Sequence, residues 1–351
     1  MSEIARVALR PDYEITRVIR GGWQLAGGHG AIDREAAIDA LVAAFDAGVT
    51  TFVCADIYTG VEELIGAFRT RVAATRGAEA AQVIKVHTKL VPDLAALDAI
   101  DRSYVEGIVD RSLRRLRVER LDLVQFHWWR YAAPGLTEVV GWLDEFRRAG
   151  KIRHVGLTNF DTAHLREALS TGVDILSVQT QYSVLDARPE NGLAAICQEH
   201  GLWLLCYGSA AGGFLSDRWL GAMEPAAPLE NRSLVKYKLI IEDFGGWELF
   251  QELLRALRRI ADRHGVDIAT IASRYVLDRP RAAAVIVGAR DRAHVADNAR
   301  IAAVALADAD RAEISAVIGR ATGPLGDCYD LERDLTGRHG SIMHYDNNAR
   351  S

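Results

Sequence analysis

Residues 50–66, TTFVCADIYTGVEELIG, contain the unit on which the predicted fold is built. The stretch begins with a short apolar run rich in β-branched and aromatic side chains, which is typical of a buried strand. A turn carrying Asp56 and Tyr58 follows, and a helix-length segment comes after it. The stretch therefore predicts a strand joined to a helix, with polar chemistry where the strand ends.

Similar apolar runs recur along the chain and alternate with helix-length segments. The eight runs are TRVIRGG, TTFVCA, VIKVHT, LDLVQFH, IRHVGLT, ILSVQTQ, LWLLCYG and AAAVIVG. Strands that are apolar at nearly every position suit a parallel sheet covered on both faces. Eight strand–helix units without a break in composition favour a closed (β/α)8 TIM barrel, with residues 1–351 forming a single domain.

Local signals agree with this alternation. Asp33 can cap a helix whose apolar positions are spaced at three and four residues, and Ser103 with Glu106 predicts a capping box before the helix that begins near Tyr104. The glycines of GGWQLAGGHG have the wrong register for a GxGxxG motif, so a Rossmann domain is disfavoured.

Two segments extend the repeat. A long insertion lies between Gly208 and Trp247, after the seventh strand, and a polar tail runs from about residue 322 to residue 351. Additions at the carboxyl end of a barrel commonly shape the substrate pocket, so both are expected to cover it. The aromatic residues and the LER sequence of the tail favour partial order over disorder.

The composition narrows the class of protein. Of the 351 residues, 49% are apolar and the net charge is −5, with acidic and basic residues interspersed. No basic patch points to nucleic acid, and no apolar run approaches the ~18 residues of a membrane span. The charged N-terminal sequence does not resemble a signal peptide, so a cytoplasmic location is expected. The four cysteines lack CxxC spacing and are expected to be buried free thiols.

Polar side chains stand at the ends of successive strands, where barrel enzymes carry their chemistry. Tyr58, Lys89 and His127 follow the second, third and fourth strands. A phenol is a poor acid at neutral pH unless a neighbouring cation stabilises its phenolate, and Lys89 can supply that cation. His127 can orient a carbonyl group by hydrogen bonding. The three together predict a proton-delivery group.

The chain resembles the aldo-keto reductase family along nearly its whole length. The matching stretches are TTFVCADIYTGVEELIG, VHTKL, LDLVQFHWW, GKIRHVGLTNF, SVQTQYSVLDARPE, CYGSAAGGFL and VIVGARDRAHVADN, and LVKYKLIIEDFGGWELFQELL is similar to a bacterial and plant-plastid branch. The resemblance implies hydride transfer between a nicotinamide cofactor and a small-molecule carbonyl or alcohol substrate. It makes Tyr58 the general acid, Lys89 its activator and His127 the partner that orients the carbonyl group.

The same resemblance implies a cofactor site. Thr158, Asn159 and Gln179 take the carboxamide-binding positions, and Tyr207 takes the position of the aromatic ring that stacks on the nicotinamide. Arg290, with Arg292 as a second candidate, is expected to pair with a 2′-phosphate, which favours NADP over NAD, although His294 stands where relatives commonly carry Arg or Gln. The expected cofactor-binding set is Trp23, Thr158, Asn159, Gln179, Tyr207, Gly208, Gly213, Leu215, Gly288, Arg290, His294 and Asn298. Trp23, Trp128 and Trp129 are expected to line the substrate pocket; no metal is expected, and the oligomeric state stays open.

Val53 departs from the family pattern, which places an aspartate five residues before the tyrosine and pairs it with the lysine. Three interpretations stay open. Val53 is an introduced substitution in an otherwise active enzyme, or the lineage tolerates valine with Asp56 compensating, or the protein binds the cofactor and hardly turns over. The last corresponds to a redox-sensing or regulatory protein that binds nicotinamide. A metal-dependent barrel hydrolase is disfavoured, because His87, His127 and Cys54 have no coherent ligand spacing.

Overall fold

The computed structural model describes residues 4–26, 32–288, 297–298 and 300–345, and within them eight parallel strands close into a barrel. The barrel order is β10-β3-β4-β5-β6-β7-β8-β9, and every neighbouring pair is parallel. The strands are β3 (Val18–Gly21), β4 (Thr51–Val53), β5 (Lys85–Leu90), β6 (Leu121–Phe126), β7 (Ile152–Thr158), β8 (Ile175–Gln181), β9 (Trp203–Tyr207) and β10 (Ala282–Val287). The predicted (β/α)8 barrel is confirmed.

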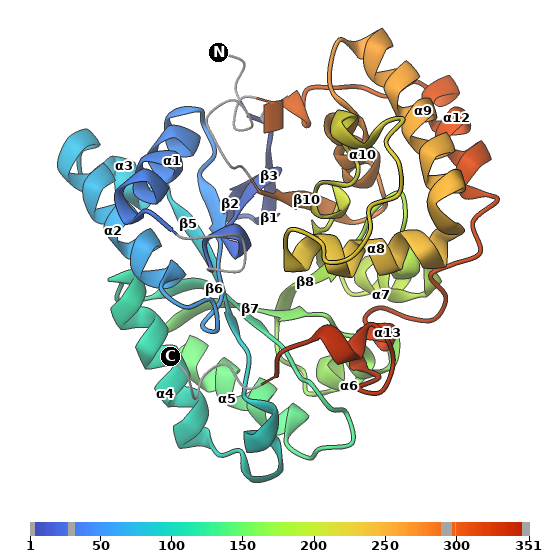
Figure 1. The fold of residues 1–351 in the computed structure, drawn as a ribbon. Helices are drawn as coiled ribbons and strands as arrows, with labels where there is room; N and C mark the ends of the chain where they lie inside the picture. Colours follow the sequence, from blue (N-terminus) through green and yellow to red (C-terminus); the bar gives the residue numbers. More distant parts are fainter. Residues whose placement is uncertain (1–3, 27–31, 289–296, 299, 346–351) are drawn as a thin grey trace.

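Helices surround the strands on the outside (Figure 1). They are α1 (Arg34–Asp46), α2 (Val61–Arg76), α3 (Ala78–Gln82), α4 (Arg102–Leu116), α5 (Leu136–Arg148), α6 (Thr162–Ser170), α7 (Leu193–Glu199), α8 (Arg232–Phe244), α9 (Gly246–His264), α10 (Ile268–Leu277), α12 (Asp308–Ile318) and α13 (Asp330–Arg333). Short 3-10 turns are η1 (Trp23–Leu25), η2 (Leu94–Ala99), η3 (Arg188–Asn191), η4 (Ala211–Gly213), η5 (Asp217–Trp219) and η6 (Gly340–Ile342). None of the helices described is both long and apolar enough to span a bilayer.

Two helix starts test the capping predictions. Asp33 caps α1 through a hydrogen bond from the Ala36 amide, as predicted. The predicted box at Ser103 is wrong, because Asp101 caps α4 and accepts the Tyr104 amide, so the helix begins at Arg102. A carboxylate two residues earlier starts the helix, so Ser103 lies inside its first turn and is not available as the N-cap.

A hairpin that the strand count did not include closes the amino-terminal end of the barrel. Strands β1 (Arg6–Arg10) and β2 (Tyr13–Thr16) pair antiparallel. Their buried side chains join the apolar layer inside the barrel, which consists of Leu9, Tyr13, Ile15, Ile19, Val53, Leu123, Leu176, Leu205, Ala283 and Ala284. The hairpin therefore keeps water out of one end and leaves the carboxyl end of the strands for chemistry.

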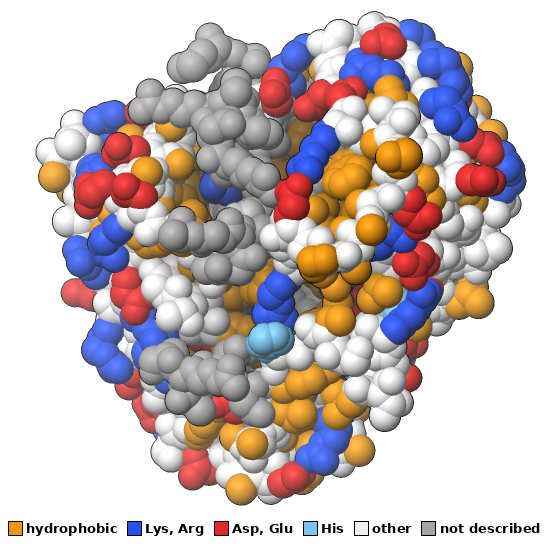
Figure 2. Space-filling model, in the orientation of Figure 1, with side chains coloured by type: hydrophobic (Ala, Val, Ile, Leu, Met, Phe, Trp, Pro, Cys, Tyr) orange, Lys and Arg blue, Asp and Glu red, His pale blue; other side chains and the backbone are white. Residues whose placement is uncertain are grey.

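The segment after β9 forms α8 and α9, and the tail is ordered from Gly319 to Tyr345 within the described range. Figure 1 shows α13, in red, in front of α6 and α7. In the same orientation, hydrophobic side chains gather over the loops between β9 and α8, while most charged side chains lie around the periphery (Figure 2). All four cysteines are free and buried, as predicted.

Candidate active site

The predicted polar group comes from the carboxyl ends of consecutive barrel strands. Tyr58 lies in the turn between β4 and α2, Lys89 lies in β5, and His127 directly follows β6. Because all barrel strands are parallel, these ends meet at one face of the barrel. Lys89 contacts Tyr58 there, whereas the His127 ring packs against Trp129 and Tyr329.

Lys89 and Tyr58 are in direct contact. The Lys89 Nζ lies 4.8 Å from the centre of the Tyr58 ring and donates to the Cys54 carbonyl at 2.8 Å. Burial lowers the pKa of Lys89 to about 8, although Cys54 and Asp56 act in the opposite direction. Burial also raises the pKa of Tyr58, so the phenol keeps its proton. The ammonium lies over the ring, and no hydrogen bond joins it to the Tyr58 hydroxyl in the described part of the chain.

Val53 points into the apolar layer of the barrel. It is 3% exposed and packs in the cluster that contains Ile19 and Leu123. Its register partner on β5 is His87. Within the described residues no carboxylate lies within ion-pair distance of Lys89. The position expected to carry the neutralising carboxylate is therefore filled by a buried apolar side chain.

Asp56 does not form the compensating pair. It is fully buried, and its Oδ2 accepts the Val91 amide at 3.2 Å. Burial, followed by repulsion from Glu62, raises the pKa of Asp56 to about 8. It attracts Lys89 only through space, without an ion pair or hydrogen bond.

His127 has one of its two ring nitrogens committed. Nδ1 lies 3.1 Å from the Thr158 carbonyl oxygen, which can only accept, so Nδ1 carries the hydrogen. Burial, and then Arg333, lower the pKa of His127 well below its usual value, so the ring is neutral. Nε2 is buried, has no hydrogen-bond partner and is an acceptor. In this arrangement His127 therefore has no free N–H with which to donate to a carbonyl group, as the predicted role requires.

The strand ends at β7 to β9 carry the groups expected at a nicotinamide. Asn159 has a left-handed backbone, with φ of 61°, and its Oδ1 accepts the Tyr207 hydroxyl at 2.8 Å. The Gln179 Oε1 accepts from Gln125, which leaves the Gln179 amide hydrogens for another partner. The Thr158 hydroxyl oxygen is buried without a partner. This orphaned oxygen and the two amides match the donors and acceptors of a carboxamide, so the residues fit the group.

Two glycines of the loop after β9 have left-handed backbones, and a side chain added at the first, Gly208, would collide with Tyr237. Gly208 and Gly213 have φ of 81° and 106°, a conformation that glycine adopts without strain. No atom lies within 4 Å of a side chain added at Gly213, so its backbone faces open space. Leu215 is fully buried and anchors the loop in the core of α8 and α9.

The expected adenine end is described only in part. Asn298 donates to the Gly288 carbonyl at 2.9 Å, which ties these two predicted residues together. Arg290, Arg292 and His294 lie outside the described residues.

The three predicted pocket tryptophans have different surroundings. Trp23 packs on Tyr58 with ring centres 5.1 Å apart, and Trp129 packs edge-on against His127 at 4.2 Å. Trp128 is wholly buried and packs on Phe126 and over Gly135, in the core beneath α5. The expectation that Trp128 lines the pocket is not met, because side chains alternate along the chain as β6 ends and His127 takes the inward position.

The tail adds residues that the sequence did not single out. Tyr329 packs edge-on against His127 with ring centres 5.5 Å apart. Arg333 donates to the carbonyls of Trp128, Trp129 and Asn159 and to the Tyr131 hydroxyl. Only the tail's aromatic and LER content hinted at such contacts. The tail covers the strand-end group, as the sequence predicted.

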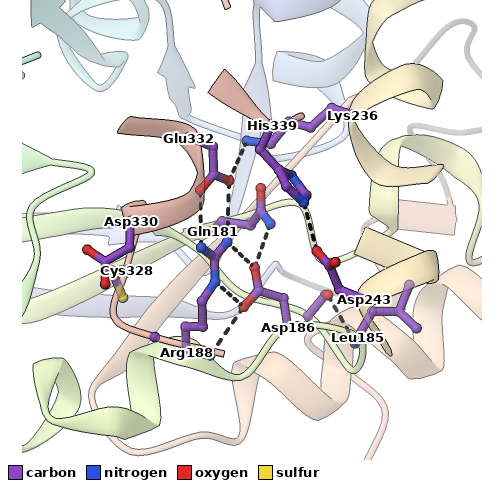
Figure 3. Close-up of polar contacts among 12 residues, drawn as sticks. Gln181, Leu185, Asp186, Arg188, Lys236, Asp243, Cys328, Asp330, Glu332 and His339 are labelled. Atoms are coloured by element: carbon purple, nitrogen blue, oxygen red, sulfur yellow. Dashed lines mark hydrogen bonds and ion pairs between the residues drawn. The ribbon is translucent and has the colours of Figure 1, made fainter. Parts of the chain in front are cut away.

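A buried ion cluster fixes the tail (Figure 3). Arg188 binds Asp186 at 2.8 Å and Glu332 at 3.1 Å, and Lys236 lies 3.5 Å from Glu332. Arg188, Asp186 and Glu332 are at most 2% exposed. The Lys236 ammonium also faces the rings of Tyr207, Tyr237 and Tyr329 at 5.3, 5.8 and 5.5 Å. We call these four charged residues the tail clamp.

The fold and the site together define a single-barrel protein with a tyrosine–lysine–histidine group at the carboxyl ends of its strands. The aldo/keto reductase family model matches residues 17–318. The chain therefore belongs to the aldo/keto reductase family, as the motifs indicated.

Relatives and solved structures agree with this assignment. The chain is 29% identical to flagellar radial spoke protein 5 of Chlamydomonas reinhardtii, over 64% of this chain and 49% of that protein. It is 32% identical to protein tas of Escherichia coli, over 54% and 60%, and 26% identical to the NADH-specific methylglyoxal reductase of that bacterium, over 79% and 87%. The match thus spans about half of the first relative and three fifths of the second.

Among solved structures, the thermostable aldo-keto reductase Tm1743, in complex with epalrestat, aligns with a TM-score of 0.69 at 25% identity, over 90% of this chain and all of that chain. Glycerol dehydrogenase AKR11B4 from Gluconobacter oxydans aligns with a TM-score of 0.74 at 22% identity, over 90% and 95%. The second likeness concerns the fold alone.

Proposed function

We propose that the protein is an NADP-dependent reductase of small aldehydes and ketones that works slowly because Val53 replaces the partner of Lys89. The observation that carries the proposal is the buried Lys89 ammonium in contact with Tyr58, beside the carboxamide-binding set at Thr158, Asn159 and Gln179. Family membership supports the reaction class. One relative is named as NADH-specific, so family membership does not decide between the two cofactors. The preference for NADP in this proposal therefore rests on Arg290.

In this proposal the bound cofactor supplies a hydride to the carbonyl carbon. Tyr58 gives its hydroxyl proton to the carbonyl oxygen, so the product is an alcohol and the tyrosine is left as a phenolate. Lys89 stabilises that phenolate when its ammonium moves from the ring face toward the oxygen, and solvent then returns the proton. Asn159 and Gln179 hold the carboxamide, and Tyr207 offers a flat face beside them.

A second function is favoured by one observation, the absence of an ion-pair partner for Lys89 among the described residues. A protein of this kind would bind nicotinamide as a redox signal and hardly turn it over. The two functions differ in a single assay. Both predict a change in NADPH fluorescence on mixing, but only a reductase oxidises the NADPH when 4-nitrobenzaldehyde is added.

The same assay run with NADH tests the cofactor preference. Tighter binding of NADPH, lost in Arg290→Met, supports NADP, and equal binding of the two cofactors would count against it. Binding without oxidation at any aldehyde concentration would favour the signalling function. No binding of either cofactor would overturn both.

A further inference from the structure

Two cations near the strand ends, Lys89 and Arg333, have no carboxylate within ion-pair distance in the described part of the chain. The Lys89 ammonium donates to the Cys54 carbonyl at 2.8 Å. Arg333 donates to the Trp129 carbonyl at 2.8 Å and to the Asn159 carbonyl at 2.6 Å, and its other hydrogen bonds go to a third carbonyl and a tyrosine hydroxyl. All of these acceptors are neutral, so neither positive charge is compensated by its direct partners.

The nearby carboxylates do not offset these two charges. The tail clamp contains two cations and two carboxylates, so it is neutral as a whole. Burial, followed by repulsion from Glu62, raises the pKa of Asp56 to about 8, so Asp56 is mostly protonated at pH 7. Asp161 caps α6 and accepts the His164 amide at 2.8 Å, so its charge is engaged with the positive end of that helix.

Both cations lie close to the place proposed for the nicotinamide ring. A terminal nitrogen of Arg333 is 2.6 Å from the carbonyl oxygen of Asn159, whose side chain is proposed to hold the carboxamide. Lys89 is the register partner of Gln125, and Gln125 donates at 2.7 Å to Gln179, the second amide of the carboxamide site. About one residue's length separates each cation from a carboxamide contact, which puts both charges roughly 10 Å from the ring.

The two redox states of the cofactor differ in the charge of that ring. The oxidised ring is cationic and the reduced ring is neutral, whereas the phosphates and the adenine are the same in both states. One positive charge about 10 Å away, at an effective dielectric constant of about 20, disfavours the cationic ring by about tenfold. Stacking on Tyr207 acts in the opposite direction. The Lys236 ammonium already lies 5.3 Å from the centre of the Tyr207 ring, however, and weakens that effect.

We propose that Lys89 and Arg333 make the site selective for the reduced cofactor, so that NADPH binds about tenfold to a hundredfold more tightly than oxidised NADP. Val53 contributes by leaving Lys89 without a counter-charge. The inference rests on the proposed nicotinamide site and names the residues that set its redox preference. Oxidised NADP then leaves readily after hydride transfer, which favours turnover in the direction of carbonyl reduction. In the signalling alternative, the same preference makes occupancy follow the ratio of the two cofactors.

The test measures the dissociation constants of NADPH and oxidised NADP for the full chain at pH 7 by isothermal titration calorimetry. Their ratio should fall by about tenfold in Lys89→Met and in Val53→Asp, because each change removes one uncompensated positive charge. Val53→Asn has nearly the shape of Val53→Asp without its charge and should keep the ratio of the unaltered protein. Lys151→Met is the control for a lost cation elsewhere, since Lys151 pairs with Glu106 and Asp110 just before β7, at the opposite end of the barrel.

Arg333 is tested by a pair of variants that separates its charge from its contacts. Arg333→Met should lower the ratio as Lys89→Met does, and Arg333→Lys, which keeps the charge, should hold it. A ratio near one in the unaltered protein, or a ratio that Lys89→Met and Val53→Asp leave unchanged, would overturn this inference. The reductase function would then stand, because oxidation of NADPH by an aldehyde does not depend on the ratio. Failure of either cofactor to bind the unaltered protein would contradict both.

Discussion

At the scale of the residue, Val53 and Lys89 decide how fast the proposed reaction runs. Lys89 is 7% exposed, and its ammonium has a carbonyl oxygen and a ring face as neighbours instead of a carboxylate. A buried charge without a counter-charge is costly, and the protein lowers the pKa of Lys89 in response. The valine thus weakens the group on which the Tyr58 phenolate depends.

Restoring a carboxylate should restore activity. Val53→Asp is expected to raise kcat on 4-nitrobenzaldehyde at least ~10-fold, because the paired ammonium stays charged and close to Tyr58. It should also move the loss of activity at alkaline pH upward from about pH 8, where Lys89 loses its proton in the unaltered protein. Val53→Asn, which has nearly the same shape and no charge, is the control. Equal rates in the three proteins, with cofactor affinity intact, would show that the missing aspartate has no bearing on turnover.

The uncompensated Lys89 charge should also lower the free energy of unfolding, and it should do so most strongly at neutral and acidic pH. The folded protein holds Lys89 with a pKa of about 8 against an unfolded value of 10.5, so the folded state binds fewer protons between these values. The free energy of unfolding therefore rises as pH increases through this window, and the cost of the ammonium is complete below it. Lys89→Met removes that cost and should stabilise the protein by about 3 kcal/mol at pH 7. The gain should shrink toward pH 10.5 in urea unfolding; a less stable variant at pH 7 would contradict this account.

At the scale of the element, the tail clamp joins three parts of the chain. Asp186 and Arg188 come from the segment between β8 and α7, Lys236 from α8, and Glu332 from α13. Burial alone would raise the pKa of Glu332, but the positive charges of Lys236 and Arg188 outweigh this effect and lower the pKa to about 2. The stability it contributes is complete above its unfolded pKa of 4.5 and is lost as pH falls toward 2.

Removing one charge of the tail clamp should destabilise the folded protein. Arg188→Met leaves two buried carboxylates with less compensation, so the free energy of unfolding should fall by about 3–5 kcal/mol at pH 7. Arg338→Met is the matched control, since Arg338 also pairs with two carboxylates but is 49% exposed and should cost less than ~1 kcal/mol. Urea unfolding of both variants checks the difference. Similar losses in the two would mean that burial does not set the strength of the clamp.

The elements themselves were predictable where a pattern repeats. The barrel strands are apolar along their length, and the α1 cap at Asp33 has a direct sequence signal. The β1–β2 hairpin was missed because it lies outside the strand–helix repeat, although its side chains complete the interior layer. The capping box at Ser103 failed because Asp101 caps the helix two residues earlier, which places Ser103 inside the first turn.

At the scale of the whole molecule, the barrel brings together strand-end residues that are far apart in sequence. Tyr58, Lys89 and His127 could be predicted because parallel topology fixes where strand ends meet. The tail could not be placed in the same way, since Arg188 and Glu332 are separated by 144 residues and no local pattern pairs them. The committed tautomer of His127 also depends on a three-dimensional contact, the Thr158 carbonyl.

The central claim is that Tyr58, in contact with the Lys89 ammonium, delivers the proton that accompanies hydride transfer. The most direct test is a single turnover of NADPH bound to the protein, followed by loss of its absorbance after 4-nitrobenzaldehyde is added. Tyr58→Phe should slow this step by about 10²–10⁴-fold while NADPH binds as before, and Tyr237→Phe, a change at another buried phenol, should not. A Tyr58→Phe variant that oxidises NADPH at the rate of the unaltered protein would contradict the account.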